Sequence, residues 1–227
     1  MKIIAIIPAR GGSKSIPLKN IKILNGKPLI AYTIETATNS KIFDKIIVST
    51  DHKKIAKICE KFSSVDIINR PAHLSLDTSS SESAILHACD VLNEHMNYTP
   101  DVIFTLEPTS PFRSISTILQ CEKIIKKPTV SSVVSVLKST EVFGIINDGE
   151  FSLLNPNQSR RRQERKPVYK VTSTIFATKL KIIKTTNDVM GGFTAPFEVS
   201  KEEAIDINNN FDFSLAEAML TIRNNQK

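Results

Sequence analysis

The sequence has few of the residues that mark specialised protein classes. Among 227 residues it has no tryptophan, seven glycines, eleven prolines and three cysteines, which excludes collagen-like and low-complexity chains. The cysteines lie far apart without a CxxC pair, so we expect reduced thiols rather than a disulfide framework. No apolar run approaches the roughly 20 residues of a membrane-spanning helix, and the run at 3–7 is too short for a secretory signal. We therefore expect a cytoplasmic protein that does not span a membrane.

Positive charge is in excess, because 30 lysines and arginines face 23 acidic residues and give a formal net charge of +7. Such a balance suits nucleic acid, an anionic membrane or a small polyanionic substrate as partner. Hydrophobic residues make up 41% of the chain, which is enough to bury a substantial core. Composition therefore predicts a globular protein and leaves the partner open.

Strand-like and helix-like patterns alternate along most of the chain. Continuous apolar runs, typical of parallel strands covered on both faces, occupy residues 2–7, 45–49, 66–68, 102–106 and 131–137. Helical spacing occurs at residues 28–37, 52–62, 80–94, 116–126 and 210–223. The alternation predicts an α/β protein with a mostly parallel sheet flanked by helices.

The pattern changes between residues 138 and 200. Short β-like pieces at 143–146, 171–177 and 197–199 are separated by polar turns, and few apolar residues remain for a separate core. We interpret 138–200 as a stretch containing a β-rich appendage inserted into a single domain that spans residues 1–227.

The loop after the first predicted strand has the chemistry of a phosphate site. Residues 8–20 combine Gly11 and Gly12 with Arg10, Lys14 and Lys19. Ligands of open parallel sheets bind beyond the carboxyl ends of the strands, where flexible backbone N–H groups and cations form a receptacle for a polyphosphate. The spacing is neither GxGxxG nor GxxxxGK[ST], which excludes the Rossmann dinucleotide and Walker motifs. A solvated basic loop is the alternative.

A series of sequence blocks resembles the acylneuraminate cytidylyltransferases, the CMP-sialic acid synthetases. In order, the blocks are IPARGGSK with KN (7–14, 19–20), VSTD (48–51), RPAHLSLDTSSS (70–81), LEPTSPFR (106–113), RQ with PVY (162–163, 167–169), and AID with FDF (204–206, 211–213). The resemblance implies a Rossmann-like nucleotidyltransferase fold, similar to that of type A glycosyltransferases. It also implies a β-rich appendage that supports a homodimer and reaches the partner subunit's site.

The activity implied by the resemblance is transfer of CMP from CTP to the anomeric hydroxyl of a nine-carbon α-keto acid sugar, with release of pyrophosphate, for surface glycan biosynthesis. The resemblance implies that the CTP phosphates are surrounded by Arg10, Ser13, Lys14 and Lys19, and that Asn20, Arg70 and Ser81 help to hold the nucleotide. Arg10, Lys19 and Asp206 are the predicted catalytic residues, and Lys19 is the best single candidate for stabilising charge in the transition state. Asp206 matches a carboxylate that binds Mg²⁺, the implied cofactor. Asn208 stands where a second aspartate is common, and its amide oxygen can also ligate Mg²⁺.

The resemblance places sugar recognition at Glu107, Arg162, Gln163, Arg165, Tyr169 and Lys170. Glu107 stands where the family often has glutamine, so it is a candidate base or acceptor beside the attacking hydroxyl; a strand-end carboxylate paired with an arginine is the alternative. Residues 171–174, VTST, replace a usual Asn-Gly. Legionaminate and pseudaminate types are therefore candidate acceptors beside N-acetylneuraminate, as are KDO-type sugar acids.

Two other functions remain as alternatives. Asn208 and the altered segment 171–174 are compatible with a CTP-binding protein that has lost the transfer step. The cationic run RRRQERK at residues 160–166 could bind the phosphate backbone of a nucleic acid, but no interleaved aromatic side chains accompany it. We therefore expect no nucleic-acid partner.

Overall fold

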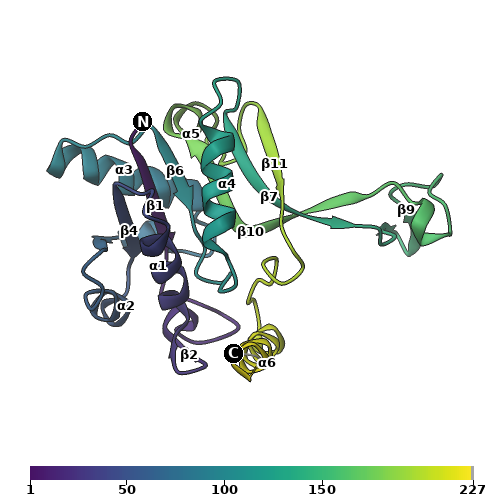
Figure 1. Cartoon of the computed structure of the whole chain (residues 1–227), viewed down its shortest axis with the longest axis horizontal. Helices are drawn as coiled ribbons and strands as arrows, with labels where there is room; N and C mark the ends of the chain where they lie inside the picture. The colour runs from purple at the N-terminus through teal and green to yellow at the C-terminus, as the bar shows by residue number, and fades with distance from the viewer. Residues whose placement is uncertain (226–227) are drawn as a thin grey trace.

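A seven-stranded sheet forms the centre of the computed structural model, which describes residues 1–225 (Figure 1). The strand order is β11-β7-β10-β6-β1-β4-β5. The bounds are β1 Ile3–Pro8, β4 Lys45–Thr50, β5 Asp66–Asn69, β6 Val102–Thr105, β7 Ser132–Ser139, β10 Val168–Lys179 and β11 Thr194–Glu198. Neighbouring strands pair in parallel except where β10 runs antiparallel to both β6 and β7. The predicted mostly parallel sheet is confirmed.

Strand β1 shows why its apolar run is continuous. Ile3, Ala5 and Ile7 join one buried cluster, while Ile4 and Ile6 join another on the opposite face of the sheet. The first cluster is completed by helices α1 (Leu29–Ser40), α2 (Lys53–Cys59) and α4 (Ile115–Ile125), and the second by α3 (Ser81–Met96) and α5 (Leu180–Thr186). All three cysteines are free and buried in these clusters. The sheet is therefore a layer between two sets of helices, as expected of an α/β fold.

Helix α6 (Asn210–Asn225) is the last helix of the described residues and lies beside the small hairpin of β2 (Ile23–Leu24) and β3 (Lys27–Pro28). A capping box starts it: the Asp212 carboxylate accepts from the backbone N–H groups of Asn208 and Asn209, and the Asn209 side chain accepts from the Asp212 N–H. Phe213, Ala216 and Leu220 pack into a third cluster that includes Ile16 of the loop after β1. The last helix thus returns to the carboxyl edge of the sheet. In the described residues, every helix is too short or too polar to cross a membrane.

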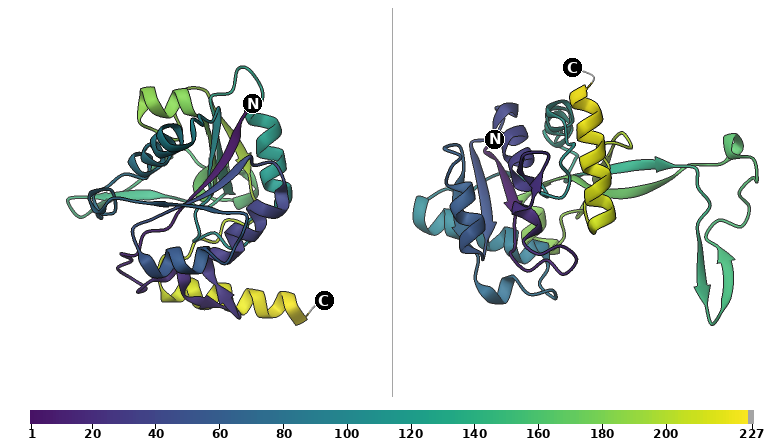
Figure 2. Two further views of the ribbon diagram at one scale, coloured as in Figure 1. Left: turned by 90° about the vertical axis from the view of Figure 1, so that its left-hand side faces the viewer. Right: turned by 90° about the horizontal axis from the view of Figure 1, so that it is seen from below.

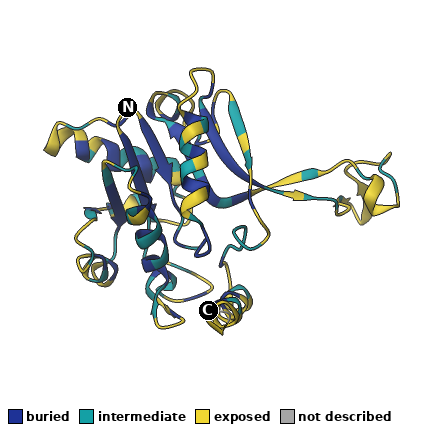
Figure 3. Cartoon of the chain, viewed as in Figure 1, coloured by how far each residue is buried: buried dark blue, intermediate teal, exposed yellow. Residues whose placement is uncertain are grey.

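The segment 138–200 divides into two parts in the structure. Strands β10 and β11 belong to the main sheet, and the unpredicted helix α5 lies between them. The remainder forms an arm that projects from one side of the body and carries the hairpin of β8 (Gly144–Asn147) and β9 (Glu150–Leu153), as Figures 1 and 2 show. The inserted arm is therefore confined to about residues 140–167. Its surface is largely exposed (Figure 3).

Candidate active site

Two adjoining cavities lie at the carboxyl ends of β1, β4, β5 and β6. One has a volume of about 330 Å³ and is lined by residues of the loop after β1, together with Glu107, Thr109 and Asn208. The other, of about 190 Å³, is lined by Arg70 and by residues 74–81, and Arg10 and Glu107 border both. Every residue predicted to bind the nucleotide lines one of them: Arg10, Ser13, Lys14, Lys19 and Asn20 the first, Arg70 and Ser81 the second. The structure brings these residues, which are far apart in sequence, together at one edge.

The loop after β1 is held in place by contacts at both ends. The Gly11 N–H donates to Asp51 Oδ1 at 2.8 Å, directly after β4. A Cβ atom at Gly11 would lie 2.6 Å from His52 Cδ2, so only glycine fits this close approach. Buried Asn20 donates through Nδ2 to the Arg10 carbonyl at 3.0 Å. Asn20 therefore joins the two ends of the loop.

Asp77 pairs with two cations of this loop. Its Oδ1 lies 2.8 Å from Arg10 Nη1 and its Oδ2 lies 2.8 Å from Lys14 Nζ. Hydrogen bonds from Lys14 first and from Arg10 second lower the pKa of this carboxyl below its usual value. The pairs are solvent-exposed, and such pairs hold weakly. An anion with more charge than one carboxylate can therefore displace Asp77 from both cations.

Arg70 is a buried cation on the wall of the smaller cavity. Its Nε donates to Ser49 Oγ at 3.1 Å and its Nη2 to the Ser49 carbonyl at 2.9 Å. Burial lowers its pKa, but a guanidinium remains charged at any physiological pH. Because both acceptors are neutral, the positive charge is available to attract an anion.

Lys19 and Glu107 bring opposite charges to the larger cavity. Lys19 Nζ donates to the Ile207 carbonyl at 2.6 Å, and burial lowers its pKa against the attraction of Asp206 and Glu107. Glu107 keeps partial exposure because it borders both cavities, yet desolvation by the surrounding protein raises its pKa to about 7, with Asp206 adding to the effect. A carboxyl with this pKa exchanges its proton near neutrality.

The Glu107 backbone is fixed by Arg113. This guanidinium is buried, donating to the Glu107 carbonyl at 2.8 Å, to Thr33 Oγ1 at 3.1 Å and to the Thr174 carbonyl. Burial lowers its pKa to about 10. Arg113 thus ties the end of β6 to α1 and to β10.

Asp206 has one satisfied and one unsatisfied oxygen. Its Oδ2 accepts from Asn208 Nδ2 at 2.9 Å and from Ser173 Oγ at 3.2 Å. Its Oδ1 is buried and, in the described part of the chain, has no hydrogen-bond partner. A buried carboxylate oxygen without a donor fits a cation. Residues 1–225 contain no group of three or more His, Cys, Asp or Glu side chains suited to a metal, so a cation held here would share its coordination with ligand oxygens, as Mg²⁺ usually does.

The comparisons with known proteins agree with this geometry. A family model described as Cytidylyltransferase matches residues 4–213. The chain belongs to this cytidylyltransferase family. It is 33% identical over its whole length to an N-acylneuraminate cytidylyltransferase of Escherichia coli, of which it spans about half (54%). It is 34% identical to a CMP-N,N'-diacetyllegionaminic acid synthase of Legionella pneumophila, covering 98% of this chain and 97% of that one.

Solved structures of cytidylyltransferases share the fold. A 4-diphosphocytidyl-2C-methyl-D-erythritol synthase of Anaerococcus prevotii superposes with a TM-score of 0.72 at 19% identity, over 97% of this chain and 96% of that one. A CMP:2-keto-3-deoxy-manno-octonic acid synthetase complexed with CTP gives 0.70 at 16% identity, over 98% and 100%. At these identities the likeness concerns the fold alone, and it confirms the expected nucleotidyltransferase architecture.

Most residues predicted to bind the sugar do not line the two cavities at the carboxyl edge of the sheet. Glu107 lines both cavities, but Arg162, Gln163 and Arg165 belong to the projecting arm. The Arg165 guanidinium donates to backbone carbonyls of the arm at residues 140, 159 and 160, which gives it a structural part there. Tyr169 and Lys170, at the start of β10, line an apolar cavity of about 270 Å³ next to Phe143 and Leu154.

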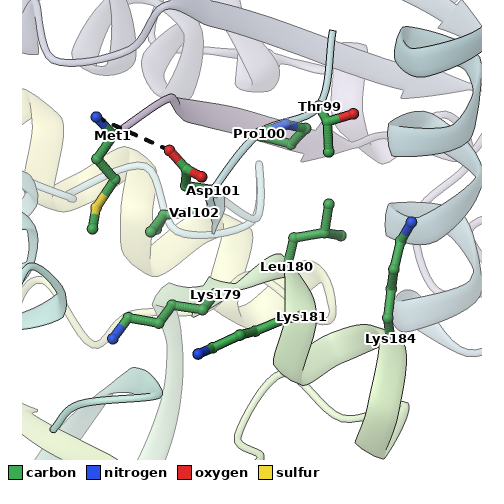
Figure 4. A pocket seen from close by; sticks show the side chains of 9 residues that line it. All are labelled: Met1, Thr99, Pro100, Asp101, Val102, Lys179, Leu180, Lys181 and Lys184. Atoms are coloured by element: carbon green, nitrogen blue, oxygen red, sulfur yellow. Dashed lines mark ion pairs between the residues drawn. The ribbon is translucent and has the colours of Figure 1, made fainter. Parts of the chain in front are cut away.

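A further cavity of about 520 Å³ lies at the opposite, amino-terminal edge of the sheet (Figure 4). It is lined by Met1, residues 99–102, residues 179–181 and Lys184, and Figure 4 shows Lys184 across the cavity from Lys179 and Lys181. None of the predicted site residues lines it. Because ligands of parallel sheets bind at the carboxyl ends of the strands, we place the candidate site at the two adjoining cavities that Arg10 and Glu107 border.

Proposed function

We propose that the protein transfers CMP from CTP to the anomeric hydroxyl of a nonulosonic acid and releases pyrophosphate. The observation that carries the proposal is the meeting of Arg10, Lys14, Lys19 and Arg70 with Glu107 at one sheet edge. Membership of the cytidylyltransferase family supports CTP as the donor. The names of the curated relatives, N-acylneuraminate cytidylyltransferase and CMP-N,N'-diacetyllegionaminic acid synthase, support a sialic or legionaminic acid as the acceptor. Use of CTP also agrees with the expected cytoplasmic location.

The proposed step is an in-line displacement at the α-phosphorus. The anomeric oxygen forms a bond to this phosphorus, the bond to the bridging oxygen of the β-phosphate breaks, and pyrophosphate leaves with the electron pair. The protein contributes position and charge rather than a covalent intermediate. When CTP binds, Arg10 and Lys14 release their ion pairs with Asp77 and pair with the triphosphate instead. Lys19 donates to the Ile207 carbonyl and stabilises the charge that develops on the phosphate oxygens.

Glu107 is the proposed acceptor of the anomeric proton. Its carboxylate borders both cavities, between the residues assigned to the triphosphate and those assigned to the rest of the nucleotide. With a pKa of about 7, it is deprotonated in a large fraction of molecules at neutral pH and still basic enough to take a proton as the hydroxyl attacks. A glutamine at this position would lack this capacity.

Mg²⁺ is the proposed cofactor, with Asp206 as its protein carboxylate. The unpartnered buried Oδ1 of Asp206 supports a cation at this position. Bound there with substrate oxygens, Mg²⁺ would neutralise phosphate charge in the displacement. The side-chain amide of Asn208 lies beside this position and donates a hydrogen bond to Asp206 Oδ2.

We also propose a homodimer built through the arm. Apolar side chains of the hairpin are strongly exposed in the single chain, including Ile146 at 72% and Phe151 at 61%. Exposed apolar groups gathered on one projecting element are typical of a protein–protein contact. In such a dimer, Arg162, Gln163, Tyr169 and Lys170 would recognise the sugar acid in the partner's site, and Arg165 would shape the arm.

Pyrophosphate release tests the proposal. The protein is mixed with Mg²⁺, one nucleoside triphosphate and one sugar acid from a panel of sialic, legionaminic, pseudaminic and octulosonic acids. We expect release with CTP and a nonulosonic acid, and none with ATP, GTP or UTP. Binding of CTP without release for any acceptor would instead support a catalytically silent CTP-binding protein.

A further inference from the structure

Strand β10 is irregular beside the site. Its register against β7 shifts between Val171 and Phe176, so the residues between them depart from regular pairing. Thr172 and Thr174 are buried there, while Ser173 stays partly exposed between them. Where extra residues interrupt the pairing of two strands, the backbone bends and a side chain is turned in a new direction. Here the redirected side chain is Ser173, whose hydroxyl lies 3.2 Å from Asp206 Oδ2.

The irregular segment is fixed by buried polar contacts on two sides. On the β7 side, Ser135 Oγ accepts from the Ile175 N–H at 2.9 Å and from Thr172 Oγ1 at 2.8 Å. On the other side, the Arg113 guanidinium donates to the Thr174 carbonyl, and Thr174 Oγ1 donates to the Glu203 carbonyl at 2.9 Å. Because all but the partly buried contact with Glu203 are buried, the backbone around Ser173 has little freedom to move.

The contact with Ser173 affects how Asp206 presents its carboxylate. Oδ2 accepts from both Ser173 and the Asn208 amide, and rotation of the carboxylate would break both hydrogen bonds. Because Oδ2 is an acceptor, the Asn208 amide must turn its nitrogen, and not its oxygen, toward Asp206. Oδ1, buried and without a donor, is then the atom left for a cation.

We propose that Ser173 is a positioning residue for Asp206: its hydroxyl, with the Asn208 amide, holds Oδ2 so that Oδ1 is presented to the divalent cation. This inference rests on the proposed function, since it assumes that Asp206 binds a cation. In this proposal, residues 171–174 orient the carboxylate of Asp206 that binds the metal, and they do not contact the sugar. It also assigns Asn208 as an orienting donor rather than a metal ligand.

Direct binding of Mn²⁺ tests the inference without catalysis. Mn²⁺ is titrated into the full-length protein with saturating CTP and no acceptor sugar, and free Mn²⁺ is measured by electron paramagnetic resonance. Loss of a hydrogen bond that orients a metal ligand typically weakens metal affinity by 10–100-fold, so we expect Ser173→Ala to bind Mn²⁺ at least about tenfold more weakly. Ser173→Thr, which keeps the hydroxyl, should retain most of the affinity, and Asp206→Ala should lose protein-dependent binding.

Thr178→Val is the matched control, because Thr178 lies on the same strand and donates to the Val189 carbonyl, away from Asp206. Its affinity for Mn²⁺ should equal that of the wild type. Equal affinities of Ser173→Ala and the wild type would overturn the inference, as would an equal loss in Thr178→Val. Absence of Mn²⁺ binding by the wild type would overturn it too, whereas pyrophosphate release, measured separately, decides the proposed function.

Discussion

Replacing Glu107 with glutamine should stabilise the ligand-free protein above neutral pH and change little in acid. In the folded protein, burial and Asp206 raise the pKa of Glu107 to about 7 from its ordinary value of 4.5. Between these two values the folded state binds more protons than the unfolded state, so stability falls as pH rises. Glutamine does not titrate, and the variant therefore escapes this loss.

The expected gain follows from the shift of the pKa. A rise from 4.5 to about 7 corresponds to at most roughly 3 kcal/mol, since each unit is worth 1.36 kcal/mol. Because Glu107 borders two cavities that admit water, solvent screening lowers the expected value to about 2 kcal/mol. For a chain of this size that difference raises the melting temperature by about 4–8 °C.

Thermal unfolding of the wild type and Glu107→Gln at pH 5 and pH 8 measures the effect, with EDTA present and nucleotide absent. We expect a higher melting temperature for the variant at pH 8 and a much smaller difference at pH 5. Glu217→Gln, on the exposed face of α6, controls for the loss of one negative charge. A Glu107→Gln variant that is no more stable than the wild type at pH 8 would refute the conclusion that desolvation of the partly buried Glu107 carboxylate destabilises the folded protein.

Further predictions concern the phosphate site, the metal and the arm. Lys19→Ala should lower turnover by at least about 100-fold, as for other lost transition-state donors, with a small change in melting temperature; a parallel collapse of both would contradict the phosphate role. EDTA should abolish pyrophosphate release, and Asp206→Asn should raise the Mg²⁺ concentration needed by at least about tenfold; release that persists without metal would exclude the proposed cofactor. Light scattering should give a dimer mass for the wild type and a monomer mass for Ile146→Asp with Phe151→Asp; a wild-type monomer at micromolar concentration would disprove the dimer.

The sequence predicts the fold well where burial follows a simple period. β1, β4 and β6 are continuous apolar runs because both of their faces pack under helices, and α1 and α3 show helical spacing for their single buried face. Strand β10 departs from this rule, since its middle carries buried threonines whose polar groups are satisfied by Ser135, Arg113 and Glu203. Because these partners come from other strands and loops, the local sequence pattern does not reveal that β10 belongs to the main sheet. From the sequence alone, this segment is therefore assigned to the appendage.

The candidate site divides in the same way. The nucleotide-binding residues could be predicted, because each lies in a recognisable block after a strand, and the structure collects them around two cavities. The supporting contacts of Asp51 with Gly11 and of Asp77 with Arg10 could not be predicted from the sequence. They depend on how separate loops meet in space, although the position of Asp51 directly after β4 is a signal that could have indicated it.

The fate of the anomeric oxygen tests the central claim most directly. A sugar acid that supports pyrophosphate release is equilibrated in ¹⁸O-labelled water, and a brief reaction with CTP is analysed by mass spectrometry. If the anomeric oxygen attacks the α-phosphorus, the label is found in the CMP-sugar, and unlabelled pyrophosphate is formed in equal amount. Absence of a CMP-sugar, or a CMP-sugar without the label, would contradict the account.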